Sequence, residues 1–459
     1  MARHSHGTPG GGVKMGNYTV LVSTQTPLMR FEGDGTGGPI GPDLPAHRLS
    51  PGGVCRMVLP TINHLRKHGW MKRAYWYSLQ PGAPAQVDLD AEIQLRHIDM
   101  PADELKAYGR SKEKLWNDLH GLPSQPFSGE DFRQYARYNY RTADALLEHA
   151  EELDVAYIHD FQLLQVGAML GLAAPCVLRW HVPFDPKLIP AYTRNWMLRV
   201  MEDFDAVIVS TRRDLQGLVD AGFSGKVRQI YPHIEPRDWP DTTASDIQSL
   251  EAQWNIQPDT KVFLLVARMD PMKRHDLALR AFARIHKEHP NSRLVLVGNG
   301  SFSGPMGGVT GKGKSTEWRE KLKWVAAELG ITNSVTFAHW IPDGLLAAAY
   351  QRADAVLLTS DIEGFGLTPL EAWRYGRVPI VSSGCGAAEI VTDAINGLVF
   401  DAGKEEALTE AMRKVVTDSE MVDRVGHAGR LTLPKFTASH VNPLIRQLLD
   451  EAVEGYRRA

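Results

Sequence analysis

Short apolar segments alternate with helical segments along most of this chain. The apolar segments have the length of strands buried on both faces of a sheet, and a helical pattern separates each one from the next. Parallel neighbouring strands need such helical crossovers, so the alternation predicts doubly wound parallel sheets in an α/β fold. The expected strands are residues 18–23, 73–79, 155–158, 176–181, 206–210, 262–267, 294–297, 335–338, 355–358 and 379–382.

The alternation falls into two similar halves. A chain of 459 residues exceeds the usual size of one hydrophobic core, so two domains are expected. Prolines and a polar run between Tyr231 and Thr260 interrupt the pattern and mark the boundary. Residues 80 to about 120 are polar and predict irregular structure, and a helix is expected over 131–153. The expected parts are a disordered tail (1–16), two Rossmann-like domains (17–240 and 241–437) and a C-terminal helix (438–459).

Composition and charge exclude several classes of protein. With 43% hydrophobic and 23% charged residues, the chain has the composition of an ordinary soluble globular protein. Its net charge of −3 gives no general attraction to nucleic acid or to an anionic membrane. No apolar run approaches the ~20 residues of a membrane span, and the N-terminus lacks the apolar core of a signal peptide. Three widely spaced cysteines, without a disulfide or metal pattern, suggest a cytoplasmic protein.

The stretch from Ser360 to Gly376 carries the strongest functional signal. It follows the apolar segment 355–358, turns through two glycines and begins a helix, with Thr368 as the expected N-cap. The first amides of a helix have no intrahelical acceptor, so this turn predicts an anion site. The residues expected to bind the anionic ligand are the turn and its two flanking glutamates: Glu363, Gly364, Phe365, Gly366, Leu367, Thr368 and Glu371.

Four other polar residues directly follow predicted strands. Arg268 and Lys273 follow the strand at 262–267 and would place two cations beside the anion site. Asp160 and His181 follow strands of the first half, at the strand ends where open α/β sheets bind ligands.

Simpler interpretations of these residues remain open. Thr368 and Glu371 have the spacing of a capping box, in which Glu371 would need no ligand. His181 can also be read as an ordinary histidine at a strand end. Arg268 and Lys273 can be read as surface charges of a solvated loop.

One further motif points to a different function. Residues 308–315 match the P-loop pattern, but the preceding strand ends near Val297, too early for a true P-loop, so a basic surface loop is favoured over an ATP site. The sequence contains no nucleophile elbow and no zinc cluster, and no metal site is expected.

The combination of features resembles the retaining GT-B glycosyltransferases. The resemblance rests on Glu363 and Glu371, with seven residues between them, and on Arg268 and Lys273 after the preceding strand. It also rests on the two α/β halves. The first half resembles trehalose-6-phosphate synthases at residues 50–53, 114–120, 159–164 and 181–184, and the second half resembles trehalose synthases that glucosylate free glucose. The resemblance covers nearly the whole chain after residue 17. It implies two Rossmann-like domains that face a central cleft.

The resemblance also implies roles for the candidate residues. Arg268 and Lys273 would hold the diphosphate of a nucleotide sugar at the helix start, without a metal ion, and Asp160 and His181 would complete the catalytic set. Glu371 would bind the ribose and Glu363 the hydroxyls of the donor sugar. A pair of glycines after the first strand would let the other domain approach the phosphates: Gly52 and Gly53.

On the acceptor side the chain departs from the family pattern. The synthases have Ser-Asn-Arg where this chain has Ser-Thr-Gln, ending at Gln25, so the arginine that holds the acceptor phosphate is missing. Such a charge-assisted bond contributes ~1.5–3 kcal/mol. A phosphate-binding tyrosine of the family falls on Ala107, although Tyr108 is adjacent. The expected acceptor residues are therefore Trp116, Asp160, Gln25 and Tyr108.

The expected reaction joins glucose from an NDP-glucose to glucose 6-phosphate, or to glucose, as an α,α-1,1 linkage with retained configuration. A transferase with another acceptor and a disaccharide phosphorylase of the same fold are the alternatives, and a P-loop ATP-binding protein is the remote one. The expected partners are these small molecules, with no cofactor, nucleic acid or membrane, and a homo-oligomer is compatible with the sequence. UDP, GDP and ADP remain open as donor nucleotides.

Overall fold

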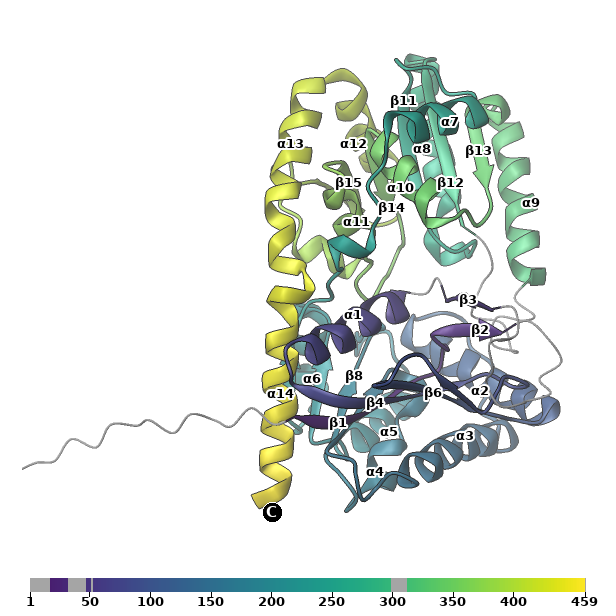
Figure 1. The fold of residues 1–459 in the computed structure, drawn as a ribbon. Helices are drawn as coiled ribbons and strands as arrows, with labels where there is room; N and C mark the ends of the chain where they lie inside the picture. Colours follow the sequence, from purple (N-terminus) through teal and green to yellow (C-terminus); the bar gives the residue numbers. More distant parts are fainter. Residues whose placement is uncertain (1–16, 32–46, 51–52, 299–311, 459) are drawn as a thin grey trace, which may run out of the picture.

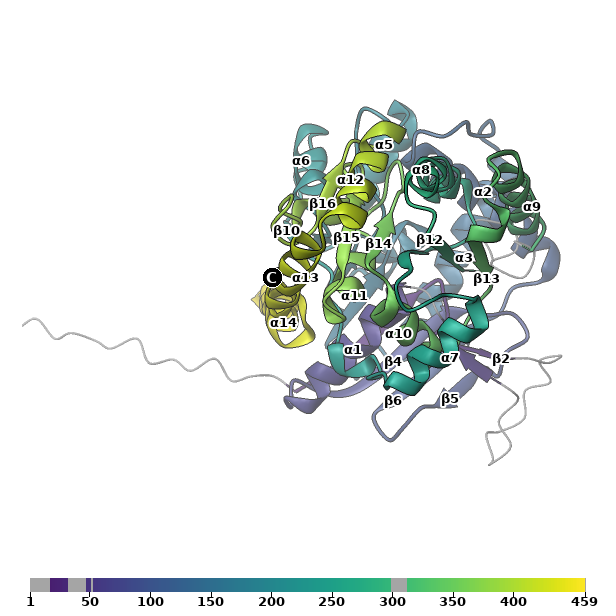
Figure 2. The ribbon, with the colours of Figure 1, turned by 90° about the horizontal axis from the view of Figure 1, so that it is seen from above.

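The computed structural model describes residues 17–31, 47–50, 53–298 and 312–458. The chain forms two α/β domains, each built on its own parallel sheet, with the second domain above the first in Figure 1. Viewed from above, the second domain covers much of the first (Figure 2). The expected tail at 1–16 lies outside the described residues, as does Gly52.

The N-terminal sheet has eight strands in the order β10-β9-β8-β7-β1-β4-β6-β5. All its pairs are parallel except β5 with β6. Alternate residues of the central strand enter different cores, Leu21 on one face and Val20 and Val22 on the other. The strands are β1 (Tyr18–Thr24), β4 (Met71–Leu79), β5 (Gln86–Asp88), β6 (Ile93–Ile98), β7 (Val155–His159), β8 (Cys176–Arg179), β9 (Ala206–Val209) and β10 (Val227–Gln229), beside a short antiparallel pair, β2 (Met29–Phe31) and β3 (His47–Leu49).

Helices cover both faces of this sheet, because its strands are apolar on both sides. The helices are α1 (Gly53–Lys67), α2 (Ala102–Leu119), α3 (Gly129–Leu147), α4 (Val166–Leu170), α5 (Ala191–Met201) and α6 (Arg212–Asp220).

The C-terminal sheet has six parallel strands in the order β13-β12-β11-β14-β15-β16. Counted from its first strand this is the order 3-2-1-4-5-6, the usual order of a dinucleotide-binding Rossmann domain. The strands are β11 (Lys261–Val266), β12 (Ser292–Val297), β13 (Val335–Ala338), β14 (Ala355–Leu358), β15 (Val378–Ser382) and β16 (Leu398–Phe400). The helices are α7 (Ala244–Trp254), α8 (His275–Glu288), α9 (Lys312–Glu328), α10 (Asp343–Arg352), α11 (Thr368–Arg374), α12 (Glu405–Thr417), α13 (Ser419–Thr432) and α14 (Ala438–Arg458).

The prediction of irregular structure from residue 80 to about 120 was wrong. Strands β5 and β6 and helix α2 lie there. Helix α2 escaped detection because its buried positions include charged residues, Lys114 and Asp118, which form an ion pair at 3.1 Å. Polar residues on both faces hide the helical period of hydrophobicity. The helix expected over 131–153 runs instead from Gly129 to Leu147.

Helix α14 returns to the N-terminal domain. In Figure 1 it runs down the side of the molecule from the second domain to the first. Its apolar face packs in the same core as Val20 and Val22 of β1, through Val441, Ile445 and Leu449 among others. The C-terminal helix thus joins the end of the chain to its first strand.

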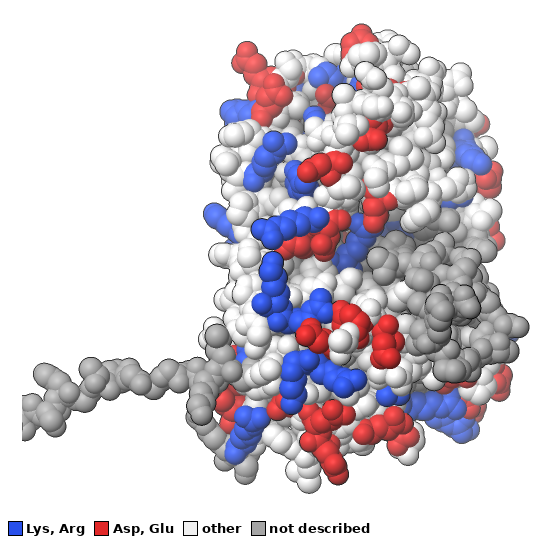
Figure 3. All heavy atoms as spheres, viewed as in Figure 1, with Lys and Arg blue, Asp and Glu red and all other residues white. Residues whose placement is uncertain are grey.

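Charged side chains of both signs alternate over the face shown in Figure 3. Among the described residues, no helix has both the length and the apolar character needed to cross a membrane.

The packing of α14 predicts a stability difference between two leucines of this helix. Leu449 is fully buried, whereas Leu444 is 47% exposed. Leu449→Ala is expected to lower the free energy of unfolding of the N-terminal domain by about 2–5 kcal/mol, because it leaves a cavity in the core. Leu444→Ala should change it by less than about 0.5 kcal/mol. Urea denaturation measures both, and equal effects would contradict this packing.

Candidate active site

The candidate residues follow strands at the switch point of each sheet. In the C-terminal sheet the order reverses between β11 and β14, which are followed by Arg268–Lys273 and by Ser360–Glu363. In the N-terminal sheet it reverses between β1 and β7, which are followed by Gln25 and Asp160. Doubly wound sheets bind ligands at these points.

Lys273 forms an ion pair with Glu363 across the switch point of the C-terminal sheet. The hydroxyl of Ser360 also donates to this carboxylate, at 3.2 Å. Burial alone would raise the pKa of Glu363, but Lys273, helped by Arg268, outweighs it and the pKa falls below its ordinary value. Glu363 is therefore a carboxylate held beside two cations.

Helix α11 begins one residue earlier than the sequence predicts. The N-cap is Leu367, and Thr368 is the first helical residue rather than the cap. No side chain caps this end. Pro369 carries no amide hydrogen and the amide of Leu370 donates to the carbonyl oxygen of Leu367 at 2.9 Å, so Thr368 supplies the remaining amide of the first three helical residues. Gly366 has a φ of 89°, which a side chain would strain, and Phe365 packs in a core. The anion-binding geometry therefore comes from the backbone.

Glu371 belongs to no capping box. Its side chain accepts a hydrogen bond from the hydroxyl of Tyr350, and burial raises its pKa, partly offset by Arg56 of the N-terminal domain. Arg56 forms an ion pair with Asp343 at 2.6 Å, and its guanidinium lies 4.9 Å from the ring centroid of Trp239. The carboxylate is thus held by groups remote from the start of its helix, and the capping-box interpretation was wrong.

Two helix N-termini face each other across the domain boundary. A Cβ added to Gly53, the first residue of α1, would lie 3.4 Å from Cδ1 of Leu367, the N-cap of α11. Both helix starts place positive dipole ends at the boundary.

The two domains are in close contact at Gly364. A Cβ at this position would lie 1.9 Å from the carbonyl oxygen of His181. Only glycine fits here, because the backbones of the two domains are in direct contact. Arg213, which sequence analysis missed, spans the same contact and donates to the carbonyl oxygens of Glu363 (2.9 Å), Gly364 (3.2 Å) and Gly384 (3.0 Å).

Helix α2 brings further groups to the boundary. The guanidinium of Arg268 lies over the ring of Trp116, 5.7 Å from its centroid, and the ring of His120 stacks on the same indole with the centroids 4.0 Å apart. Lys112 is buried one turn before Trp116, and burial, together with the charge of Arg268, lowers its pKa to about 8. Lys112, in α2, and His120, its C-cap, were not predicted as site residues.

Asp160 has an unusual backbone conformation. Its φ of 72° and ψ of 175° fall in a region used almost only by glycine, which costs about 1–3 kcal/mol. The amide of His181 donates to its carboxylate at 3.4 Å. Burial raises the pKa of Asp160 to about 7, although the amides of Phe161, His181 and Val182 favour the charged form.

His181 is paired with a second histidine. Its Nε2 lies 2.9 Å from Nδ1 of His159, and the two rings are parallel within 9°. Burial, the neighbouring ring and the fully buried Arg179 together lower the pKa of His181 well below its ordinary value. His181 is therefore a neutral side chain that is hydrogen-bonded to His159.

The other two predicted acceptor residues make their printed contacts within the N-terminal domain. Gln25 directly follows β1, and its carbonyl oxygen accepts from the amide of Leu79 at 3.2 Å. Tyr108 is buried among Tyr135 and Tyr138, with its hydroxyl enclosed, and it is close enough to Asp160 for the two to interact electrostatically. Of the P-loop alternative, residues 308–311 lie outside the described residues, whereas Gly313, Lys314 and Ser315 belong to the first turn of α9.

Within the described part of the chain, no group of three or more His, Cys, Asp and Glu side chains is arranged to hold a metal ion. What the site presents to a ligand is therefore a set of cations and helix amides on one side and Asp160 with His181 on the other.

Comparison with known proteins gives two family matches. Residues 246–432 match the family model described as Glycosyl transferases group 1, and residues 97–216 match Trehalose synthase, N-terminal domain. A trehalose synthase of Rubrobacter xylanophilus is 27% identical over 326 residues, which cover 69% of this chain and 74% of that protein. A D-inositol 3-phosphate glycosyltransferase of Corynebacterium jeikeium is 27% identical over 259 residues, 56% of this chain and little more than half (57%) of that relative.

Solved structures of the same fold exist. An α,α-trehalose-phosphate synthase (UDP-forming) from Burkholderia xenovorans, solved in complex with glucose-6-phosphate, superposes with a TM-score of 0.75 at 16% identity, over 95% of this chain and 100% of that one. This confirms the predicted GT-B architecture of two Rossmann-like domains. The protein has the GT-B fold, its second domain matches the model of group 1 glycosyl transferases, and its first domain matches that of the N-terminal domain of trehalose synthases.

Proposed function

We propose that the protein is a retaining glucosyltransferase that moves glucose from an NDP-glucose to glucose 6-phosphate, or to glucose, and forms an α,α-1,1 linkage. The observation that carries the proposal is the pairing of Lys273 with Glu363 beside the uncapped start of α11, at the switch point of a Rossmann-ordered sheet. This arrangement suits a sugar diphosphate.

On the donor side, the diphosphate would lie at the start of α11. Arg268 and Lys273 would neutralise the charge that grows on the departing diphosphate, which lowers the barrier without a metal ion. The amides of the α11 start and of the facing α1 start would add hydrogen bonds. Glu363 would accept from hydroxyls of the donor sugar, and Glu371 from the ribose.

On the acceptor side, the chemistry needs no protein nucleophile. The bond between the anomeric carbon and the diphosphate oxygen breaks, the acceptor hydroxyl bonds to the same face, and its proton passes to the departing phosphate oxygen. Asp160 would orient the acceptor or donor hydroxyls, and the neutral His181 would accept or donate one hydrogen bond. Closing the domains over this centre would exclude water.

The acceptor's phosphate would find cations other than the missing arginine. Lys112 lies one helical turn before Trp116, and its pKa is lowered in part by Arg268, whose guanidinium lies over the Trp116 ring. Lys112 would therefore meet the acceptor's phosphate, while Arg268 lies between that phosphate and the donor diphosphate. One relative is a D-inositol 3-phosphate glycosyltransferase. A phosphorylated polyol is therefore a second candidate acceptor for the same site.

A matrix of donors and acceptors tests the proposal. UDP-, GDP- and ADP-glucose are each offered with glucose, glucose 6-phosphate, inositol 3-phosphate and inorganic phosphate, and released nucleotide is measured. Turnover is expected with glucose 6-phosphate or glucose and at least one donor, with the α,α-1,1 product identified by NMR. Turnover with inositol 3-phosphate alone would establish the second candidate, and none with glucose or its phosphate would refute the trehalose assignment.

Two lysines separate the transferase from the P-loop alternative. Lys273→Ala should lower kcat at least a hundredfold, because it removes a cation that stabilises the leaving diphosphate. Lys314→Ala, in the P-loop-like segment, should leave kcat unchanged. The opposite result, inactive Lys314→Ala and active Lys273→Ala, would contradict the proposal.

The raised pKa of Asp160 predicts a pH dependence. The ionised carboxylate can accept a hydroxyl proton and the protonated one cannot, so kcat/KM should rise with pH until it levels above about 7. Asp160→Asn should remove this rise and lower the rate.

The contribution of Asp160 to the free energy of unfolding should fall as the pH rises. A raised pKa in the folded state favours folding below the ordinary carboxyl pKa, and this contribution is lost as the pH rises through about 7.

The exposed Asp203 supplies the control for both measurements. Asp203→Asn should keep the wild-type pH profile of kcat/KM and the wild-type pH dependence of urea denaturation. A pH profile of Asp160→Asn that still rises through 7 would assign the titration to another group.

A further inference from the structure

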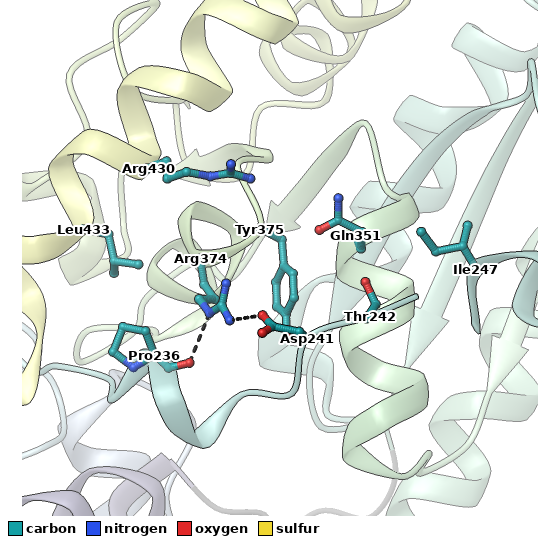
Figure 4. Close-up of a pocket in the computed structure, with 9 residues that line it drawn as sticks. All are labelled: Pro236, Asp241, Thr242, Ile247, Gln351, Arg374, Tyr375, Arg430 and Leu433. Carbon is teal, nitrogen blue, oxygen red and sulfur yellow. Dashed lines mark hydrogen bonds and ion pairs between the residues drawn. The ribbon is translucent and has the colours of Figure 1, made fainter. Parts of the chain in front are cut away.

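A cavity of about 510 Å³ lies at the opposite end of α11 from the candidate active site. Its walls come from the linker between the domains, from α10, from the last residues of α11 and from the region of α13. Figure 4 shows two arginine side chains, Arg374 and Arg430, reaching toward it from different elements. None of the residues proposed to bind the donor lines it.

The cavity has an excess of positive charge. Arg374 donates to the carbonyl oxygen of Pro236 at 3.1 Å and to the carboxylate of Asp241 at 2.6 Å. The Asp241 side chain is 93% exposed, so this pair is a weak surface ion pair. Arg430 is exposed and makes no ion pair with any described residue; its guanidinium packs over Gly376. The lining therefore holds two guanidinium groups and one carboxylate, which is exposed.

The remaining lining groups suit the small polar part of a ligand, such as a sugar, that also carries an anionic group. Thr242 and Gln351 offer a hydroxyl and an amide, and Tyr375 contributes one aromatic wall. A guanidinium presents paired donors that match phosphate oxygens, which favours a phosphoryl group over a single charge. The volume falls in the range of small-molecule sites and accommodates a monosaccharide phosphate.

A chain of aromatic contacts connects this cavity to the donor side. Tyr375, in the cavity wall, stacks on Tyr350 with the ring centroids 5.7 Å apart and the planes within 8°. The hydroxyl of Tyr350 donates to Glu371. Tyr375 also donates to the carbonyl oxygen of Pro240 in the linker, at 3.0 Å. A ligand that moves the linker or Tyr375 therefore acts on the carboxylate proposed to hold the ribose.

We infer that this cavity is a second site, for a small phosphorylated metabolite such as a sugar monophosphate, which regulates donor binding through Tyr375 and Tyr350. The binding itself does not depend on the proposed function, but its effect on the donor does. Since coupling between two sites is reciprocal, the metabolite and the nucleotide should change each other's affinity by the same factor.

Calorimetric titration of the full chain with ribose 5-phosphate, without donor or acceptor, tests the site. Ribose 5-phosphate carries the phosphoryl group and a sugar body, and it is not one of the proposed acceptors. Saturable binding to one site is expected, and none with ribose. Arg430→Gln should weaken binding about tenfold or more, because a charge-assisted hydrogen bond is lost. The same titration, in a saturating concentration of the nucleoside diphosphate that the donor matrix identifies, should show a changed dissociation constant but a retained site.

Arg424→Gln is the matched control, since it removes the same charge from the same helix. Its guanidinium donates to the carbonyl oxygen of Ala394, outside the cavity, and binding should stay at the wild-type value. Absence of binding to the wild type, equal binding by Arg430→Gln, or a loss caused by Lys273→Ala would each overturn the inference. A protein that binds ribose 5-phosphate in this way but transfers no glucose would refute the proposed function and leave the site established.

Discussion

The contact between Gly364 and the carbonyl of His181 governs how the two domains meet. Because no side chain fits between these backbones, the turn after β14 lies directly against the end of β8. Arg213 then holds the carbonyl oxygens of the same turn. One short turn thereby places the start of α11 and the Glu363 carboxylate on one side of the boundary, and His181 and Asp160 on the other. A shift of either backbone would separate the proposed donor and acceptor groups.

Positive charge gathers at this boundary. Lys273 forms an ion pair with Glu363, and Arg268 and the buried Lys112, which come from opposite domains, interact electrostatically. Two facing helix starts add positive potential. Such an arrangement stabilises an anion that enters it far more than water would, since the opposing groups are already fixed. The fold thus holds these cationic groups in position before a diphosphate binds.

The strands and the donor turn were predictable because their signals are local. Buried parallel strands are apolar throughout, and a glycine turn followed by Pro369 marks a helix start within one residue. The partners of those residues were not predictable. Tyr350 meets Glu371, and Arg213 meets Glu363, across 21 and 150 residues of sequence, and only the packing of elements brings them together. Helix α2 was missed for another reason, since its buried face carries the Lys114–Asp118 ion pair.

The strained backbone of Asp160 lowers the stability of the N-terminal domain and fixes the position of the carboxyl group. A glycine at 160 would adopt the same φ and ψ without strain, but it would carry no carboxylate. The surrounding structure holds the residue through its amide, which donates to the carbonyl oxygen of Arg179 at 2.8 Å, and through the His181 amide on its side chain. Arg179 in turn helps to keep both His159 and His181 neutral. A carboxyl group whose pKa is raised to about 7 therefore lies beside a histidine whose pKa is lowered, so a single proton, on Asp160, would decide how this side of the proposed site receives a sugar hydroxyl.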